Sequence, residues 1–165
     1  MGGRSMILYH GGTEAVMQPD CAKGRKNLDF GQGFYVTMIE EQAEGFARRK
    51  ANDRRAEAIV SVYEFDYEKA IRDYRVLKFA TYNEEWLDFV VNSRNGFRMW
   101  ENYDLIEGGV ANDRVIDTVE LYNIGLLDKK AALGRLSEHQ PNHQICILSQ
   151  DLLNECLTFK EAIEL

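Results

Sequence analysis

The chain has 165 residues, 45% of them hydrophobic and 28% charged, which is the size and composition of one globular domain that can bury a core. Its net charge of −7 argues against general nucleic-acid binding, because such binding depends on many Lys and Arg contacts to phosphate. No stretch approaches the ~20 apolar residues of a membrane span, and the N-terminus lacks the apolar core of a signal peptide. We therefore expect no membrane contact and a cytoplasmic location.

A single domain is expected over residues 6–165, because no linker, low-complexity segment or internal repeat interrupts them. Residues 1–5 show no pattern and are interpreted as an expression remnant or a disordered start. The cysteines, Cys21, Cys146 and Cys156, are unclustered, which favours a reducing compartment and argues against a disulfide framework. With three histidines in the chain and no ligand spacing among them, we expect no metal site.

The first half of the chain predicts short strands around one helix. β-branched and aromatic runs indicate the strands. Helical spacing places Ala43, Phe46, Ala47 and Ala51 on the face of the helix expected to be buried. In chain order, the predicted elements are a strand at 6–9, a loop at 13–30, a strand at 34–37, a helix at 40–52 and strands at 58–65 and 76–79.

The second half predicts more helix. Asn83 and Asp128 are expected to cap helices, and Gly125 is expected to end one. The predicted elements are a helix at 83–92, a strand at 103–107, helices at 113–123 and 128–138, a strand at 144–148, a helix at 150–155 and a strand at 157–159. Strands and helices that do not alternate regularly predict the α+β class.

Two short motifs are the most informative part of the sequence. A strand ends in Leu8-Tyr9-His10-Gly11-Gly12, and the glycine-bearing run Gly31-Gln32-Gly33 leads into Phe34-Tyr35-Val36-Thr37. In order and spacing, this pair resembles the first two signature elements of the NAD-using ADP-ribosyltransferases, the group of the poly-ADP-ribose polymerases and diphtheria toxin. The resemblance implies two small packed sheets with an NAD-binding cleft between them, and NAD as a substrate.

The resemblance also implies roles for individual residues. His10 would hold the adenosine-side ribose, the backbone of Gly11 would pair with the carboxamide, and Tyr35 would stack on the nicotinamide ring. Gly12 and Phe34, their neighbours in the two motifs, are assigned to the same NAD site. Taken singly, a histidine at a strand end and a tyrosine in a strand are more typical of structural residues. Their functional interpretation depends on the two motifs together.

A third element lies near the C-terminus. The run from Asn142 to Leu148 resembles the Asn-Glu-Tyr-Ile-Val-Tyr element of the polymerases, and Gln144 occupies the position of the catalytic glutamate. Glutamine can hydrogen-bond a ribose hydroxyl, but it supplies no negative charge and cannot act as a base. Asp113 or Glu107 could provide the missing carboxylate, although Asp113 is equally typical of a helix N-cap.

Two basic clusters need separate interpretations. Arg25 lies in the loop before the second motif, where a cation could meet a phosphate of the cofactor, and we assign it to the NAD site. The run Arg48-Arg49-Lys50 falls on the predicted helix and is interpreted as a solvated charged face.

Over about residues 7–159, the joint order of these motifs resembles a bacterial family of unknown function grouped with the ADP-ribosyltransferases. Its genes often lie beside a small antitoxin-like gene. The resemblance implies a toxin that transfers one ADP-ribose unit from NAD to an unknown protein or nucleic-acid acceptor, with a small antitoxin protein as a possible partner. Two alternatives stay open: a catalytically weak or inactive module that binds NAD, ADP-ribose or a partner, and an RNA-modifying transferase, which the net charge of −7 disfavours.

Overall fold

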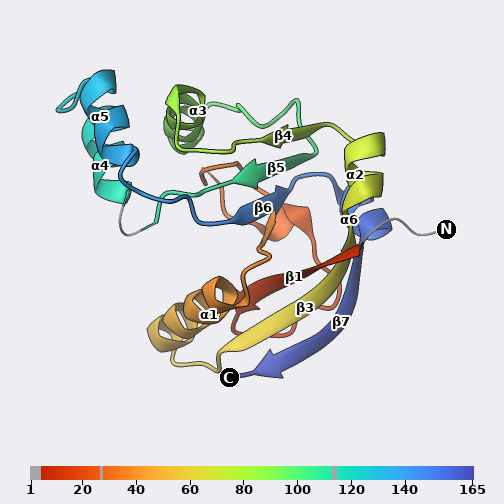
Figure 1. The fold of residues 1–165 in the computed structure, drawn as a ribbon. Helices are drawn as coiled ribbons and strands as arrows, with labels where there is room; N and C mark the ends of the chain where they lie inside the picture. Colours follow the sequence, from red (N-terminus) through yellow and green to blue (C-terminus); the bar gives the residue numbers. More distant parts are fainter. Residues whose placement is uncertain (1–4, 27, 113–114) are drawn as a thin grey trace.

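The computed structural model describes residues 5–26, 28–112 and 115–165, and these form an α+β fold with two sheets (Figure 1). One sheet has the strand order β1-β3-β7 and the other the order β2-β6-β5-β4, and every pairing except β4–β5 is antiparallel. The strands are β1 (Ser5–Gly12), β2 (Phe34–Val36), β3 (Ile59–Asp66), β4 (Val76–Lys78), β5 (Leu105–Gly108), β6 (Gln144–Ile147) and β7 (Leu157–Glu164).

The helices are distributed around the sheets (Figure 1). They are α1 (Glu40–Arg54), α2 (Tyr67–Asp73), α3 (Glu84–Arg94), α4 (Ile116–Asn123), α5 (Lys129–Leu136) and α6 (Gln150–Cys156), with a 3-10 turn η1 (Cys21–Lys23). Helix α1 covers the outer face of the β1-β3-β7 sheet, and α3, α4 and α5 lie together beyond the other sheet. No helix in the described ranges is long and apolar enough to span a membrane.

Most of the predicted elements are present, and the caps explain where several begin. Asn83 accepts a hydrogen bond from the Trp86 amide, and Asp128 accepts one from the Ala131 amide, so both N-caps are confirmed. Gly125 has φ +82° and follows α4, as expected of a helix stop. The predicted start of that helix at Asp113 lies outside the described residues.

Two elements differ from the prediction. Helix α2 was not predicted, because strand β3 runs directly into its N-cap, Asp66, whose carboxylate accepts the Lys69 amide at 3.1 Å. Strand β7 continues to Glu164 rather than ending at Phe159, because it pairs with β3 along its length. Beyond Phe159 the side chains of β7 do not predict a strand, and the strand continues there because its backbone pairs with β3, which is distant in the sequence.

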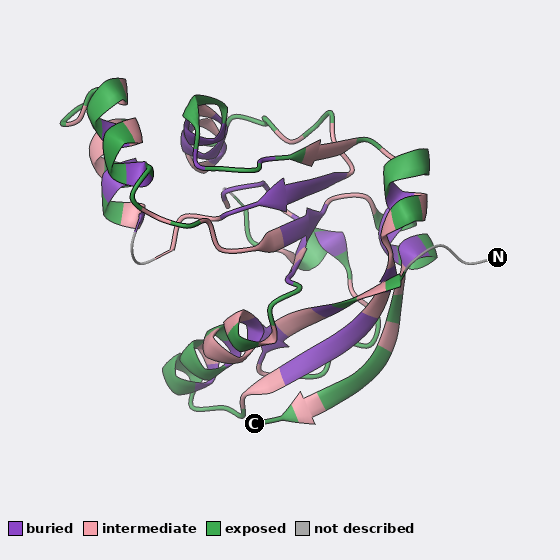
Figure 2. Cartoon of the chain, in the orientation of Figure 1, coloured by how far each residue is buried: buried purple, intermediate pink, exposed green. Residues whose placement is uncertain are grey.

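Three clusters of buried side chains make up the core. The first lies between the β2-β6-β5-β4 sheet and α3–α5, the second between the two sheets and against α2 and α6, and the third between α1 and the β1-β3-β7 sheet. Figure 2 shows β5, β6 and the middle of β3 buried, whereas β7 is largely exposed. Each sheet residue can therefore be assigned to a face by the cluster it joins.

Helix α1 packs through small residues. Ala43, Ala47 and Ala51 are buried, as expected, but Phe46 is 44% exposed, so its predicted place in the core is wrong. The reason is the close approach of α1 to β1: a Cβ at Gly11 would lie 2.1 Å from the Ala43 carbonyl oxygen. Only alanines fit under the helix at that distance, and the bulky Phe46 ring lies beside the contact, where Arg49 and Lys50 lie over it.

Candidate functional site

A backbone bridge joins the two sheets, between Tyr9 of β1 and Thr37 just after β2. The Tyr9 amide donates to the Thr37 carbonyl at 2.8 Å, and the Thr37 amide donates to the Tyr9 carbonyl at 2.9 Å. Beyond this bridge β1 continues along β3, while β2 pairs with β6, so the two strands separate. We call the diverging strand ends, residues 9–12 and 34–37, the strand opening, and they carry both of the motifs that the sequence singled out.

Gly11 presents its backbone to this opening. In an antiparallel ladder the N–H and C=O groups of successive residues point alternately to the two sides of the strand. Because those of Tyr9 point away from β3 toward Thr37, those of Gly11, two residues further on, also point away from β3. They make no hydrogen bond to any residue of the described chain. Gly11 is itself buried, and its N–H and C=O are one unpaired donor and one unpaired acceptor among the described residues.

His10 reaches across the same opening. Its Nδ1 lies 2.7 Å from the Tyr35 carbonyl oxygen, so Nδ1 carries the proton and donates it. Burial lowers the pKa of His10 to about 4, the bond to Tyr35 opposes that shift, and the charge of Lys50 adds to it. The ring is neutral at pH 7, and Nε2, which has no partner among the described residues, is left as an acceptor.

Phe34 and Gly12 determine how the His10 ring is held. The Phe34 ring stacks on it, with centroids 4.5 Å apart and planes 26° apart. A Cβ at Gly12 would lie 3.7 Å from Nε2 and 3.9 Å from Cδ2 of His10, and no atom of another described residue comes within 4 Å of it. Glycine at this position therefore leaves the approach to Nε2 open, as a hydroxyl ligand would need.

Tyr35 is anchored by its hydroxyl. The hydroxyl donates to the Gly31 carbonyl at 2.8 Å and accepts from the Phe30 amide at 3.1 Å, and burial raises its pKa well above the ordinary value. These bonds tie β2 to the loop before it, in which Gly31 has φ +93°. The ring packs at the border of the cluster below α3–α5. Tyr35 thus has the structural role that a strand tyrosine, taken singly, would be expected to have.

Gln144 shares a face with Tyr35. Along β6, Ile145 and Ile147 point between the sheets, whereas Cys146 points to the opposite face, and Gln144 must alternate with Ile145. Tyr35 pairs with Cys146, so Gln144 is its diagonal neighbour, roughly 7–8 Å away. The structure therefore brings Gln144 to the same face as the tyrosine, while His10 lies on the inner face.

Glu107 belongs to a different cluster. It pairs with Ile145 and therefore points between the sheets, away from the Gln144 face. Its carboxylate accepts hydrogen bonds from the Tyr67 hydroxyl at 2.7 Å and from Nε2 of His143 at 3.1 Å, while Nδ1 of His143 accepts the Met38 amide. Burial by itself raises the pKa of Glu107, but these two bonds and the charge of Lys78 lower it overall. Glu107 is thus a buried, hydrogen-bonded anion on the opposite face of the sheet from Gln144.

Two other assigned residues are less informative. Arg25 is exposed, in the loop before β2, and Asp113 lies outside the described residues. None of the described residues forms a group of three or more His, Cys, Asp or Glu able to hold a metal ion. Cys21, Cys146 and Cys156 are free thiols, and all three are buried.

Sequence reasoning missed the contribution of α1. Gln42, Phe46 and Lys50 follow one another at intervals of four residues, so they share one face of the helix, adjacent to the alanines that contact β1. The Gln42 amide donates to the His143 carbonyl at 2.8 Å and accepts the His143 amide at 3.2 Å. At its other end this face brings Lys50 close enough to affect His10. The four-residue spacing could have indicated that these residues share a face, but Phe46 is apolar, so that part of the helix was assigned to the core.

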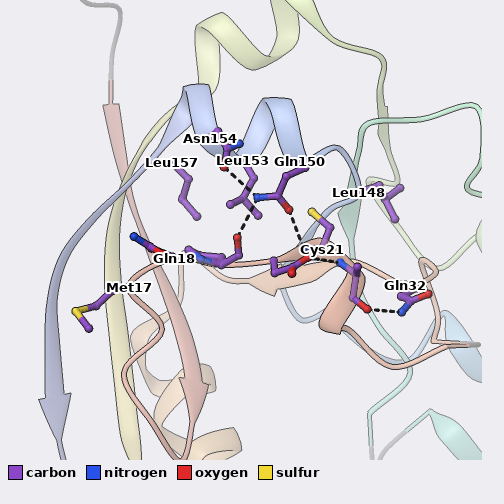
Figure 3. A pocket seen from close by; sticks show the side chains of 12 residues that line it. Met17, Gln18, Cys21, Gln32, Leu148, Gln150, Leu153, Asn154 and Leu157 are labelled. Carbon is purple, nitrogen blue, oxygen red and sulfur yellow. Dashed lines mark hydrogen bonds between the residues drawn. The ribbon is translucent and has the colours of Figure 1, made fainter.

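A hollow lies elsewhere, between the loop after β1 and α6 (Figure 3), with a volume of about 810 Å³. Its polar side chains are engaged with the protein: the Gln150 amide bonds the Cys21 amide, the Pro19 carbonyl and Asn154, and Gln32 donates to two loop carbonyls. None of the motif residues His10, Gly11 and Tyr35 lines it. Because the polar side chains of this hollow are already hydrogen-bonded to the protein and those motif residues do not line it, we place the candidate site at the strand opening instead.

Comparison with known proteins gives one match. A family model described as "Protein of unknown function (DUF3990)" matches residues 6–159, which is nearly the whole chain and includes both motifs and Gln144. No curated protein and no solved structure matches the chain. The chain therefore belongs to the DUF3990 family.

Proposed function

We propose that the protein is an ADP-ribosyltransferase-like domain that binds NAD at the opening between β1 and β2 and transfers one ADP-ribose unit to a macromolecular acceptor. The observation that carries the proposal is the unpaired backbone of Gly11 beside a neutral His10 whose Nε2 is free. The first suits a carboxamide, and the second suits a ribose hydroxyl. The two-sheet α+β arrangement supports the finer assignment to this fold.

The reaction would need little covalent chemistry from the protein. The bond between the ribose C1′ and the nicotinamide nitrogen breaks, and nicotinamide leaves with the bonding electrons. A nucleophile of the acceptor then bonds to C1′ and releases its proton to solvent. Gly11 would hold the carboxamide of the nicotinamide and His10 the adenosine-side ribose, so most of the effect would come from orientation. Gln144 would hydrogen-bond a ribose hydroxyl without removing a proton.

The test uses NAD labelled in its adenylate half. Calorimetric titration should show NAD binding to the wild-type protein, and incubation with a cell extract should transfer label to a macromolecule. His10→Ala should abolish the transfer, whereas His139→Ala, a replacement of the same kind near the end of α5, should not. Unchanged labelling by His10→Ala would refute this function, as would an absence of NAD binding at millimolar concentration.

A second candidate is a binding module that holds NAD or ADP-ribose without transferring it. The placement of Gln144 favours it, because the nearby buried carboxylate of Glu107 points to the other face of the sheet. Gln144→Glu distinguishes the two, with Gln144→Met as the uncharged control. A large gain in NAD hydrolysis by the glutamate variant would show a site arranged for this chemistry but lacking the charge. No gain, combined with NAD binding, would support the binding module.

A further inference from the structure

Three cations around the strand opening lack carboxylate partners. Lys50 and Arg54 lie four residues apart in the last turns of α1, and Arg25 lies in the loop before β2. None of them forms an ion pair or hydrogen bond with a described residue. Arg48 on the same helix differs, because it pairs with Glu44 at 3.7 Å. In an acidic protein, unpaired cations gathered in one place need an explanation.

Backbone contacts hold the two segments that carry these cations against β1 and against the start of β2. A Cβ at Gly11 would lie 3.0 Å from the Ala47 amide nitrogen, so the turn of α1 that carries Lys50 begins against β1. On the other side, a Cβ at Gly24 would lie 2.3 Å from the Gly33 carbonyl oxygen. Arg25 therefore comes directly after a residue that contacts Gly33, and Gly33 precedes Phe34, whose ring stacks on His10.

Lys50 is the centre of the group. Its side chain is half-buried, with Nζ 4.6 Å from the centroid of the Phe46 ring. Burial lowers the pKa of Lys50, and the positive charges of Arg54 and Arg25 lower it further. The charge of Lys50 in turn lowers the pKa of His10. The cations therefore repel one another, and a bound anion would relieve that repulsion.

Favourable interaction with the helix dipole explains only part of this arrangement. Cations in the last turn of a helix are stabilised by its partial negative charge, which suits Arg54 and Lys50. The dipole does not account for Arg25, which comes from a different segment. It also does not require Lys50 to be half-buried among like charges, because an exposed lysine would interact equally well with the helix terminus.

We propose that Lys50, Arg54 and Arg25 form a diphosphate-binding site at the end of the opening next to His10, which takes the phosphates of a dinucleotide. The assignment of these phosphates to NAD rests on the proposed function, whereas binding of a diphosphate as such does not. Two phosphates carry enough negative charge to engage three cations, and lysine and arginine are the usual phosphate ligands in proteins. Lys50, interpreted from the sequence as part of a solvated face, thereby becomes a binding residue.

Inorganic pyrophosphate is the direct probe. Calorimetric titration should show binding that weakens with added salt, and Lys50→Gln should reduce the affinity by about tenfold or more, as expected for loss of one charge-assisted contact. Lys50→Arg should retain most of the binding because it keeps the charge. Arg48→Gln is the matched control on the same helix, and it should change the affinity by less than about twofold.

Thermal unfolding supplies a readout that is independent of the affinity. Without ligand, Lys50→Gln should raise the Tm by roughly 2–4 °C, because it removes a half-buried charge from beside two others. With pyrophosphate, the wild-type Tm should rise, and that of Lys50→Gln should rise much less. A variant that had merely lost structure would instead have a lower Tm in both conditions, and that result would overturn the proposal.

The outcomes separate this site from the proposed function. Pyrophosphate binding that depends on Lys50, without NAD binding or transfer, would uphold the diphosphate site and overturn NAD as its ligand. NAD binding that is equal in the wild type and in Lys50→Gln would overturn the diphosphate site and leave the function standing. Weaker binding of both ligands in Lys50→Gln, with Arg48→Gln unchanged, would support both.

Discussion

Each residue of the candidate site combines a structural contact with an open atom. His10 uses Nδ1 to hold the Tyr35 carbonyl and keeps Nε2 unpaired. Gly12 has no side chain that could cover this nitrogen. The Tyr35 hydroxyl is hydrogen-bonded to the preceding loop, so only the ring can contact a ligand. Substitutions can therefore separate the two tasks of each residue.

Gly12→Val tests whether Nε2 of His10 is a ligand contact. A Cβ at this position meets only the His10 ring, at ordinary contact distance, so the variant should fold with a free energy of unfolding within about 0.5 kcal/mol of the wild type. Its branched side chain would cover Nε2, and NAD affinity in calorimetry should fall by about tenfold or more. Gly12→Ala, which adds one methyl group, should have a smaller effect. Full NAD affinity in Gly12→Val would show that no ligand uses Nε2.

Tyr35→Phe and Tyr35→Ala separate the hydroxyl from the ring. Tyr35→Phe leaves the Phe30 amide and the Gly31 carbonyl without their partner, so denaturant unfolding should show a loss of about 1–2 kcal/mol. Because the ring remains, NAD affinity should change only a few-fold, whereas Tyr35→Ala should abolish it. If the two variants bind equally poorly, the ordered loop rather than the ring determines binding.

At the scale of elements, the packing of α1 on β1 positions the site. The helix approaches so closely at Gly11 that its own backbone occupies the place of a side chain. This contact also brings the face of α1 that carries Gln42, Phe46 and Lys50 alongside the opening. The alanines of α1 thus stabilise the fold and determine which cation reaches His10.

Gly11→Ala should destabilise the protein by about 1–3 kcal/mol in denaturant unfolding, because the methyl group would meet the Ala43 carbonyl oxygen and the helix would have to move. Gly45→Ala on the same helix is the control, and it should change the free energy of unfolding in the opposite direction. A Cβ there meets only the end of the Arg49 side chain, at 3.9 Å, so the gain in helix propensity should stabilise the protein by about 1 kcal/mol. Equal stability of Gly11→Ala and the wild type would show that α1 is not held tightly against β1.

At the scale of the whole molecule, the two sheets share one backbone bridge and a common core. Two titratable groups lie at that junction, His10 and Glu107, and both have lowered pKa values. A histidine whose pKa falls from its ordinary 6.5 to about 4 on folding is favoured as the neutral form in the folded state. Its contribution to stability is complete above pH 6.5 and is lost as the pH falls toward 4. Glu107 acts in the same direction, and its contribution is lost as the pH falls through its lowered pKa.

The protein should therefore lose stability between pH 6.5 and 4. The pKa shift of His10 corresponds to at most about 3 kcal/mol of this loss, and the partial exposure of its ring reduces the loss below that limit. Urea unfolding at several pH values should show a flatter profile for His10→Gln over that interval, and His139→Gln should follow the wild type. A profile for His10→Gln that parallels the wild type would show that the histidine is not held neutral by the fold.

Local patterns in the sequence were sufficient for the class and for most elements. The caps at Asn83 and Asp128, the stop at Gly125 and the run that became β3 depend on contacts between near neighbours in the chain. The same patterns failed where packing between distant segments decided the outcome. Phe46 has the spacing of a core residue, but the closeness of α1 to β1 excludes it.

The candidate site follows the same division. The sequence by itself determined that His10 and Gly11 lie near the end of one strand, that Tyr35 lies in the next and that Gln144 begins a late one, because strand propensity and glycine placement are local properties. Only the tertiary structure decided that Gln144 shares a face with Tyr35 and that Glu107 points the other way. It also decided that Lys50 lies near His10. Strand register and helix packing set these relations, and both arise from contacts between segments far apart in the chain.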